Sequence, residues 1–140
     1  MTEHAFRVHC PVEVRFRDCD PMGHVNNAVY LTYLEIARFA YWKAADIARL
    51  AGEVSYIIAR VEIDFRSPAV TGQVLDVAIA VTGFGRTSFS MAYEIRDEGG
   101  RLVATAKSVQ VAYDYAAEQT VPLPDAIKRR IAEFEGLQSD

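Results

Sequence analysis

The stretch RDCDPMGHVNNAVYLTYLEIAR, residues 17–38, places a polar turn directly before an apolar helical pattern. In the polar half, Pro21 favours an extended backbone at the preceding Asp20, and Gly23 allows a tight reversal of the chain. In the apolar half, hydrophobic residues recur every three or four positions, which is the period of an amphipathic helix. The stretch therefore predicts a carboxylate held at a corner, followed at once by the N-terminus of a long helix.

The helical pattern runs from Asn27 to about Ala51, and Gly52 is its expected end. Its hydrophobic residues cover nearly the whole circumference, so we expect other parts of the protein to surround it. Alternating or β-rich runs, bounded by turn residues, predict strands in the rest of the chain. These strands are expected over residues 12–16, 54–65, 73–82, 87–96 and 101–115, and a short amphipathic helix over residues 124–134.

The order of one strand, one long helix and four consecutive strands predicts an α+β fold. Short turns between the last four strands imply a mostly antiparallel sheet, and the apolar helix must lie against one of its faces. We therefore expect a single curved sheet of five strands around a central helix. A length of 140 residues is that of one domain, so residues 1–140 are assigned to a single domain. The open edges of the sheet predict association with further copies.

Charge, cysteines and hydropathy argue against several classes of function. The formal net charge of −4 gives no broad basic field, so we expect no nucleic-acid partner. Cys10, Cys19 and the three histidines lack the spacing of a metal site, so no metal is expected. No run reaches the roughly 18 apolar residues of a membrane span, and the N-terminus does not resemble a signal peptide. We therefore expect a cytoplasmic protein without a membrane span.

Asn26 and Asn27 stand where the helix N-cap is expected. The first backbone amides of a helix lack internal acceptors, and the positive end of the helix dipole favours negative charge there. Such amides can stabilise an oxyanion, and the neighbouring Asp20 can act as base or nucleophile, which together suit attack on an activated carbonyl. The alternative from the residues alone is that Asp18 and Asp20 only stabilise the turn.

The string DCDPMGHVNNAVY, residues 18–30, followed by YLE at 33–35 and AR at 37–38, resembles the signature of hot-dog-fold thioesterases of the 4-hydroxybenzoyl-CoA type. DFRSPAVTGQVL, residues 64–75, is similar to that family's turn into the third strand. The resemblance covers about residues 8–115. It implies a hot-dog fold, and hydrolysis of an acyl-CoA to a carboxylic acid and free coenzyme A. Coenzyme A is then part of the substrate, and no cofactor is implied. It also implies a homodimer or homotetramer with active sites at subunit interfaces.

By this resemblance, Asp20 matches the family's catalytic carboxylate, and Asn27 matches the position whose backbone amide binds the thioester oxygen. Gly23 and Asn26 support the turn that presents them. His24 is a candidate for orienting water or substrate, and its alternative is an imidazole that only stabilises the turn. Tyr30 is a candidate for the wall of the acyl pocket.

Coenzyme A requires cations at the mouth of the pocket. Arg60, Arg66, Arg86 and Lys107 are available on or beside the predicted strands, and Arg86 and Arg60 are the candidates. Arg86 leads, because it follows Gly83-Phe84-Gly85 and precedes Thr87-Ser88, a turn where amides, the Ser88 hydroxyl and a guanidinium can meet phosphate. The alternative for Arg86 is a solvated arginine in a hairpin turn.

Two further acidic residues are expected to be structural. Asp18 is expected to be neutralised by Arg15 or Arg17. Glu35 lies about 12 Å along the helix from Asn27, too far for the same carbonyl, so a pair with Arg38 or with a neighbouring strand or subunit is expected. Two other functions remain open: hydrolysis of an acyl group on acyl carrier protein, and non-catalytic binding of acyl-CoA.

Overall fold

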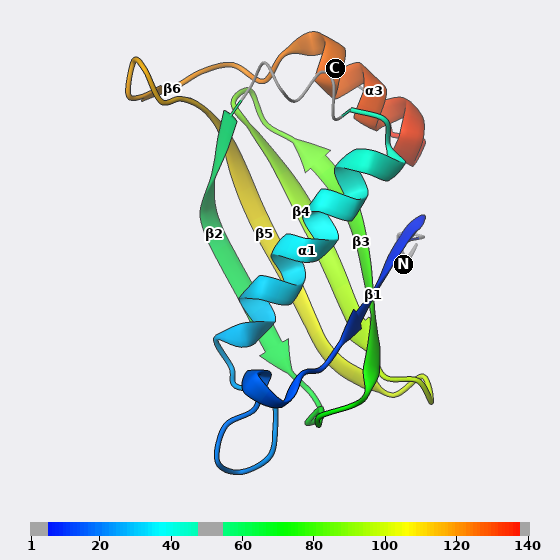
Figure 1. Ribbon diagram of the computed structural model, residues 1–140. Helices are drawn as coiled ribbons and strands as arrows, with labels where there is room; N and C mark the ends of the chain where they lie inside the picture. The colour runs from blue at the N-terminus through cyan, green and yellow to red at the C-terminus, as the bar shows by residue number, and fades with distance from the viewer. Residues whose placement is uncertain (1–5, 48–54, 138–140) are drawn as a thin grey trace.

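The computed structural model of the protein describes residues 6–47 and 55–137, which form one sheet and two α-helices (Figure 1). The elements in chain order are β1 (Val8–Glu13), a short 3-10 helix η1 (Phe16–Asp18), α1 (Val29–Ala44), β2 (Ser55–Phe65), β3 (Val74–Phe84), β4 (Ser88–Arg96), β5 (Leu102–Asp114), β6 (Gln119–Thr120) and α3 (Asp125–Glu135). Four of the five predicted strands and both predicted helices lie close to their expected positions.

The strands form one antiparallel sheet in the order β1-β3-β4-β5-β2, and the two-residue β6 pairs with β5. The sheet curves around α1, which crosses its concave face, while α3 covers one end (Figure 1). The predicted α+β architecture is therefore confirmed. The short β6 strand was not predicted.

The core lies between α1 and the concave face of the sheet. Every second residue of β3 and β4 points toward the helix, as the two-residue period of a strand requires. The largest fully buried side chains of these three elements are Tyr33, Leu34 and Tyr41 of α1, Leu75 and Ile79 of β3, and Met91, Tyr93 and Ile95 of β4. This packing fixes the orientation of α1 about its own axis, and hence which way its N-terminus faces.

The outer face of α1 is not surrounded within the described protomer. Leu31, Ile36 and Phe39 are exposed there, Phe39 to 67%. The expectation of a helix covered on all sides is therefore wrong for one copy of the chain. The helix also ends earlier than predicted, at Ala44, and Asp46 follows with a left-handed φ of 56°. Gly52, the predicted end, lies outside the described residues.

The first strand is displaced from its predicted position at residues 12–16. It begins at Val8 and ends at Glu13, and Phe16 lies in η1 with its side chain exposed. The chain leaves the sheet here because the Asp18 carboxylate accepts the Arg15 N–H at 3.0 Å, which closes the 3-10 turn. Competition from this local hydrogen bond overrode the alternating pattern.

Candidate active site

The loop between η1 and α1 carries Asp20 and is closed by its own backbone. Asp20 N–H donates to His24 O at 2.9 Å, and Gly23 N–H donates to Asp20 O at 2.9 Å. Gly23 adopts a left-handed φ of 86°, the conformation for which glycine is favoured. The predicted proline-glycine corner is therefore present.

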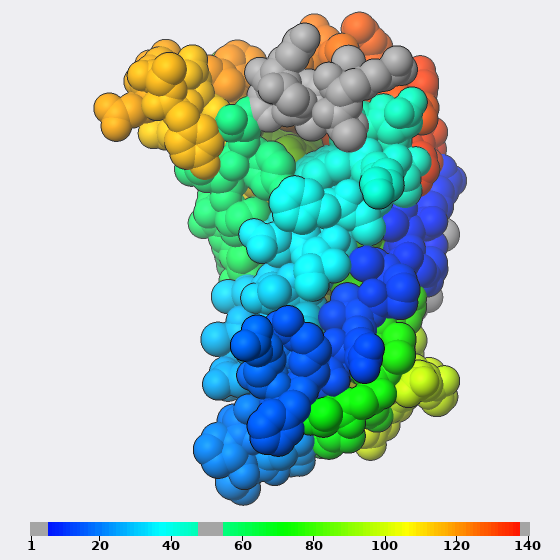
Figure 2. All heavy atoms as spheres, in the orientation of Figure 1, coloured from blue at the N-terminus to red at the C-terminus, as the bar shows by residue number. Residues whose placement is uncertain are grey.

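The same loop packs against the turn that precedes β3. Val25 N–H donates to Ala69 O at 2.9 Å, and His24 forms an isolated bridge with Val70. Asn26 N–H donates to Asp18 O at 2.9 Å. The loop thus lies between η1 and the β2–β3 connection, at the end of the molecule opposite α3 (Figure 2).

Helix α1 begins at Val29, two residues after the predicted start at Asn27. Its N-cap is Ala28, whose side chain cannot cap. Asn26 stabilises this end instead: its Oδ1 accepts the Ala28 N–H at 3.0 Å, and its carbonyl accepts the Val29 N–H at 2.9 Å. Within the described part of the chain, the Asn27 N–H has no acceptor. An unused amide is therefore present just before the helix, as an oxyanion site requires.

Asp20, His24, Asn27 and Tyr30 line one surface hollow of about 320 Å³, together with Val25, Phe65, Arg66, Ser67 and Pro68. Asp20 is half-buried, and its Oδ1 accepts the Met22 N–H at 2.9 Å. Among the residues that the structure describes, no group bonds its Oδ2. One carboxylate oxygen is thus held by the turn, and the other is available to water or a substrate.

Tyr30 forms one wall of the hollow. Its ring contacts Phe65 with centroids 5.3 Å apart and Tyr33 with centroids 5.7 Å apart. Burial raises the pKa of the Tyr30 hydroxyl, so this group stays protonated at neutral pH. The wall is therefore mainly apolar, and it carries no charge.

Sequence reasoning missed most of the residues contributed by the end of β2. Phe65, Ser67 and Pro68 were not proposed for the site, and Arg66 was only one of several available cations. They reach Asp20 because the His24–Val70 bridge joins the loop to the chain after β2. The similarity of residues 64–75 to a family motif was the one available signal, and it gave no contact partner.

The remaining binding candidates lie elsewhere in the protomer. Arg86 and Ser88 follow β3, whose 11 residues span about 33 Å, so they lie at the end of the sheet opposite the Asp20 loop. Arg86 lines a second hollow of about 380 Å³ with Lys128 of α3. Arg60 points away from α1, is hydrogen-bonded to Glu62, and lines a third hollow of about 420 Å³. Of the four predicted substrate-binding residues, one protomer therefore brings only Tyr30 to the hollow that contains Asp20.

The two acidic residues predicted to be structural differ in their outcome. Asp18 is neutralised by Arg15, one of its two predicted partners, at 3.0 Å. Glu35 is exposed on α1, and its expected ion pair with Arg38 is not formed. Arg38 is instead buried to 7% exposure and donates to the Tyr93 hydroxyl at 3.2 Å. Of the partners predicted for Glu35, Arg38 is wrong because it faces the sheet, and a partner on a neighbouring subunit stays a prediction.

The described residues offer neither a metal cluster nor a membrane-spanning helix. Within residues 6–47 and 55–137, no three His, Cys, Asp or Glu side chains lie close enough together to hold a metal ion. None of the helices in these ranges has the length and hydropathy needed to cross a bilayer. The expectation that the protein uses no metal stays a prediction.

Comparison with known proteins places this geometry in a family. Residues 14–131 match the thioesterase-like superfamily. A long-chain acyl-CoA thioesterase of Escherichia coli strain K12 is 26% identical over 126 residues, which cover 88% of this chain and 96% of that protein. A 1,4-dihydroxy-2-naphthoyl-CoA hydrolase of Synechococcus elongatus is 28% identical over 120 residues, 82% of this chain and 88% of that protein.

A solved structure supports the same assignment. A thioesterase of Thermus thermophilus, in complex with coenzyme A and zinc, is 37% identical and superposes with a TM-score of 0.83 over 95% of this chain and 97% of its own. The family match spans far more than half of the sequence, and the fold agrees over nearly all of it. The chain therefore belongs to the thioesterase-like superfamily and has the hot-dog fold of its relatives.

Proposed function

We propose that the protein hydrolyses an acyl-CoA thioester, with Asp20 as base or nucleophile and the Asn27 amide as oxyanion donor. The observation that carries this proposal is the hollow that Asp20 and Asn27 share. It holds a carboxylate with one unbonded oxygen next to an amide without an acceptor among the described residues. Family membership supports the reaction class, because the relatives named above are thioesterases or CoA-ester hydrolases.

Two routes use the same atoms. In the first, Asp20 removes a proton from water, and the resulting hydroxide attacks the thioester carbonyl. In the second, the Asp20 oxygen attacks the carbonyl, and water then hydrolyses the mixed anhydride. In both routes negative charge develops on the carbonyl oxygen, which the Asn27 N–H can stabilise. The thiolate of coenzyme A departs readily, since an ordinary thiol has a pKa of about 8.5, so a strong general acid is not required.

The bound nucleotide requires a second copy of the chain in this proposal. Arg66 is the cation that lines the Asp20 hollow, whereas Arg86 and Ser88 lie at the far end of the sheet. Exposed apolar residues on α1, together with the free edge of β2, favour a homodimer or a dimer of such dimers. In that assembly the partner supplies the Arg86 turn to a substrate held at Asp20.

The test is thiol release from short-chain, long-chain and aromatic acyl-CoA esters. We expect Asp20→Asn to lower kcat by at least about 100-fold, the scale of a lost acid–base group. Asp125→Asn, which alters an exposed aspartate of α3, is the matched control and should leave kcat unchanged. Equal rates for wild type and Asp20→Asn would remove Asp20 from the reaction.

The same assay separates the remaining functions. Cleavage of acyl groups on carrier protein but not on coenzyme A would favour the carrier-protein hydrolase, and binding without any cleavage would favour a non-catalytic module. Label from ¹⁸O water that enters Asp20 during a single turnover would identify the nucleophilic route, because a general base forms no covalent bond to the acyl group.

A further inference from the structure

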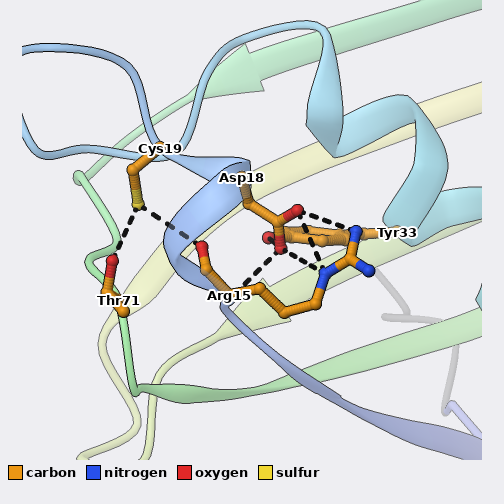
Figure 3. A network of polar contacts seen from close by, with 5 residues as sticks. All are labelled: Arg15, Asp18, Cys19, Tyr33 and Thr71. Carbon is orange, nitrogen blue, oxygen red and sulfur yellow. Dashed lines mark hydrogen bonds and ion pairs between the residues drawn. The ribbon is translucent and has the colours of Figure 1, made fainter.

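The proposed chemistry uses neither of the two buried carboxylates among the described residues, Asp18 and Glu135, and Asp18 is the one beside the proposed site. It is 2% exposed and lies two residues before Asp20 in the chain. Its Oδ2 accepts the Arg15 N–H at 3.0 Å and the Tyr33 hydroxyl at 2.8 Å, and its Oδ1 accepts the Arg15 Nη2 at 3.0 Å (Figure 3). A buried carboxylate with this many donors is held in one orientation.

The Asp18 backbone joins the two ends of the loop between η1 and α1, which carries Asp20. Its carbonyl accepts the Asn26 N–H at 2.9 Å, and the next residue, Cys19, forms an isolated bridge with Val25. Asp20 follows Cys19 directly, and Asn27 follows Asn26 directly. Asp20 therefore lies two residues from Asp18, and Asn27 lies one residue from Asn26, which is hydrogen-bonded to the Asp18 carbonyl.

Tyr33 ties this unit to α1. The Tyr33 side chain is 2% exposed, it lies on the helix face that packs on the sheet, and its hydroxyl reaches Asp18 from there. Cys19 adds a contact on the other side, where its Sγ lies 3.3 Å from the Thr71 Oγ1 in the turn before β3 (Figure 3). The loop is thus fixed to the helix through Asp18 and to the β2–β3 connection through Cys19.

The protonation states of Asp18 and Tyr33 favour the hydrogen bond between them. Burial alone would raise the pKa of Asp18, but the hydrogen bonds from Arg15 and Tyr33 outweigh it and hold that pKa below its usual range. Burial and the neighbouring Asp18 carboxylate raise the pKa of Tyr33 well above its ordinary value. At neutral pH the acceptor is therefore ionised and the donor is protonated.

We propose that the Tyr33–Asp18 hydrogen bond is a positioning element of the active site, which sets the distance between the Asp20 carboxylate and the Asn27 amide. Its effect on turnover rests on the proposed function above. Neither Asp18 nor Tyr33 lines the hollow, so neither touches the substrate. Loosening this bond displaces reacting groups without removing a substrate contact, and such displacement lowers kcat more than it raises KM.

The test compares Tyr33→Phe with Tyr41→Phe. Both tyrosines are buried in α1, and both hydroxyls donate to a buried carboxylate, but Tyr41 donates to Glu135 of α3, at the opposite end of the molecule. We expect Tyr33→Phe to lower kcat about tenfold with KM within about twofold of wild type. Tyr41→Phe should keep kcat within about twofold. Both are assayed well below their unfolding transitions, so that the folded fraction is equal. Asp18→Asn, which keeps the shape of the side chain, should resemble Tyr33→Phe.

A second readout does not depend on catalysis. Amide hydrogen exchange in residues 19–27, followed by mass spectrometry, should be about tenfold faster in Tyr33→Phe and unchanged in Tyr41→Phe. Equal kcat values for the two variants, or equal exchange in residues 19–27, would overturn the positioning role. If the wild type cleaves no thioester, the proposed function fails, and the exchange measurement alone decides whether Tyr33 holds the loop.

Discussion

Helix α1 has a buried tyrosine toward each end, and the two make the same kind of hydrogen bond for different purposes. Tyr33 donates to Asp18 at 2.8 Å, and Tyr41 donates to Glu135 at 2.6 Å. The carboxylates differ in their other partners. Asp18 is paired with Arg15, whose side chain is 60% exposed, whereas Glu135 also accepts the Val81 N–H of β3 at 2.9 Å. One pair borders a surface loop, and the other lies among core elements.

The difference follows from which backbone groups lack partners. The pairing of β3 with β4 shifts between Val81 and Gly83, so a backbone N–H inside the fold requires another acceptor. Glu135 supplies it and thereby fixes α3 to β3 and α1. At the other end the Asp18 carboxylate accepts the Arg15 N–H, just beyond β1, and the Tyr33 hydroxyl, next to the loop that carries Asp20. The same chemistry thus stabilises the fold at one end and orders the proposed site at the other.

Replacing Glu135 or Asp18 should give the largest losses in the free energy of unfolding. Glu135→Ala removes the shared acceptor of the Tyr41 hydroxyl and the Val81 N–H in the core, and we expect a loss of about 3 kcal/mol in the free energy of unfolding. Asp18→Ala should cost about 2 kcal/mol, because Arg15 can turn to water. Urea unfolding measures both. A larger loss for Asp18→Ala would contradict the contrast between core and loop.

The tyrosine substitutions should have smaller effects on stability. Tyr33→Phe and Tyr41→Phe each remove one hydrogen bond to a carboxylate, and each should lower the free energy of unfolding by about 1–2 kcal/mol. The double variant should show the sum within about 0.5 kcal/mol, since the two pairs share no partner. Thermal and urea unfolding of all three variants check this. A marked departure from additivity would mean that the two ends are coupled through α1.

Two glycines with left-handed backbone provide a further pair. Gly23 lies in the Asp20 loop with a φ of 86°, and Gly136 ends α3 with a φ of 72°. Alanine at either position should cost about 1 kcal/mol, because a Cβ disfavours this conformation. Only Gly23→Ala should also lower kcat, because only Gly23 belongs to the proposed site. If Gly136→Ala lowers the kcat of the folded protein equally, the two ends are not independent.

The smallest expected effect is on the pH dependence of stability. Because the folded pKa of Asp18 lies below its unfolded value of about 3.9, ionised Asp18 stabilises the fold above that pH. This contribution is lost as the pH falls through the folded pKa. The difference in the free energy of unfolding between wild type and Asp18→Asn should therefore be constant near pH 7 and shrink below about pH 4. A difference that stays constant down to pH 3 would contradict the ionised, hydrogen-bonded Asp18.

Local patterns predicted most of the elements but not their limits. The runs that became β2 to β5 were recognised because turn residues bound them, and α3 because of its helical period. The first strand was misplaced, since a hydrogen bond from the Arg15 N–H to the Asp18 carboxylate closes a turn where alternation suggested a strand. The outer face of α1 could not be judged either, because exposure depends on the number of copies that assemble.

The sequence by itself predicted the corner at Asp20, since Pro21 and Gly23 act through local backbone preference, and its resemblance to a family motif indicated Asp20 and Asn27 as the catalytic candidates. Only the tertiary structure decided what joins them. It brought Phe65 and Arg66 to Asp20, left Arg60 and Arg86 on another face and another end, and directed Asp18 inward to Tyr33 while Asp20 faces the hollow. The physical reason is that contacts between distant segments depend on strand order and helix packing, which no local pattern of residues specifies.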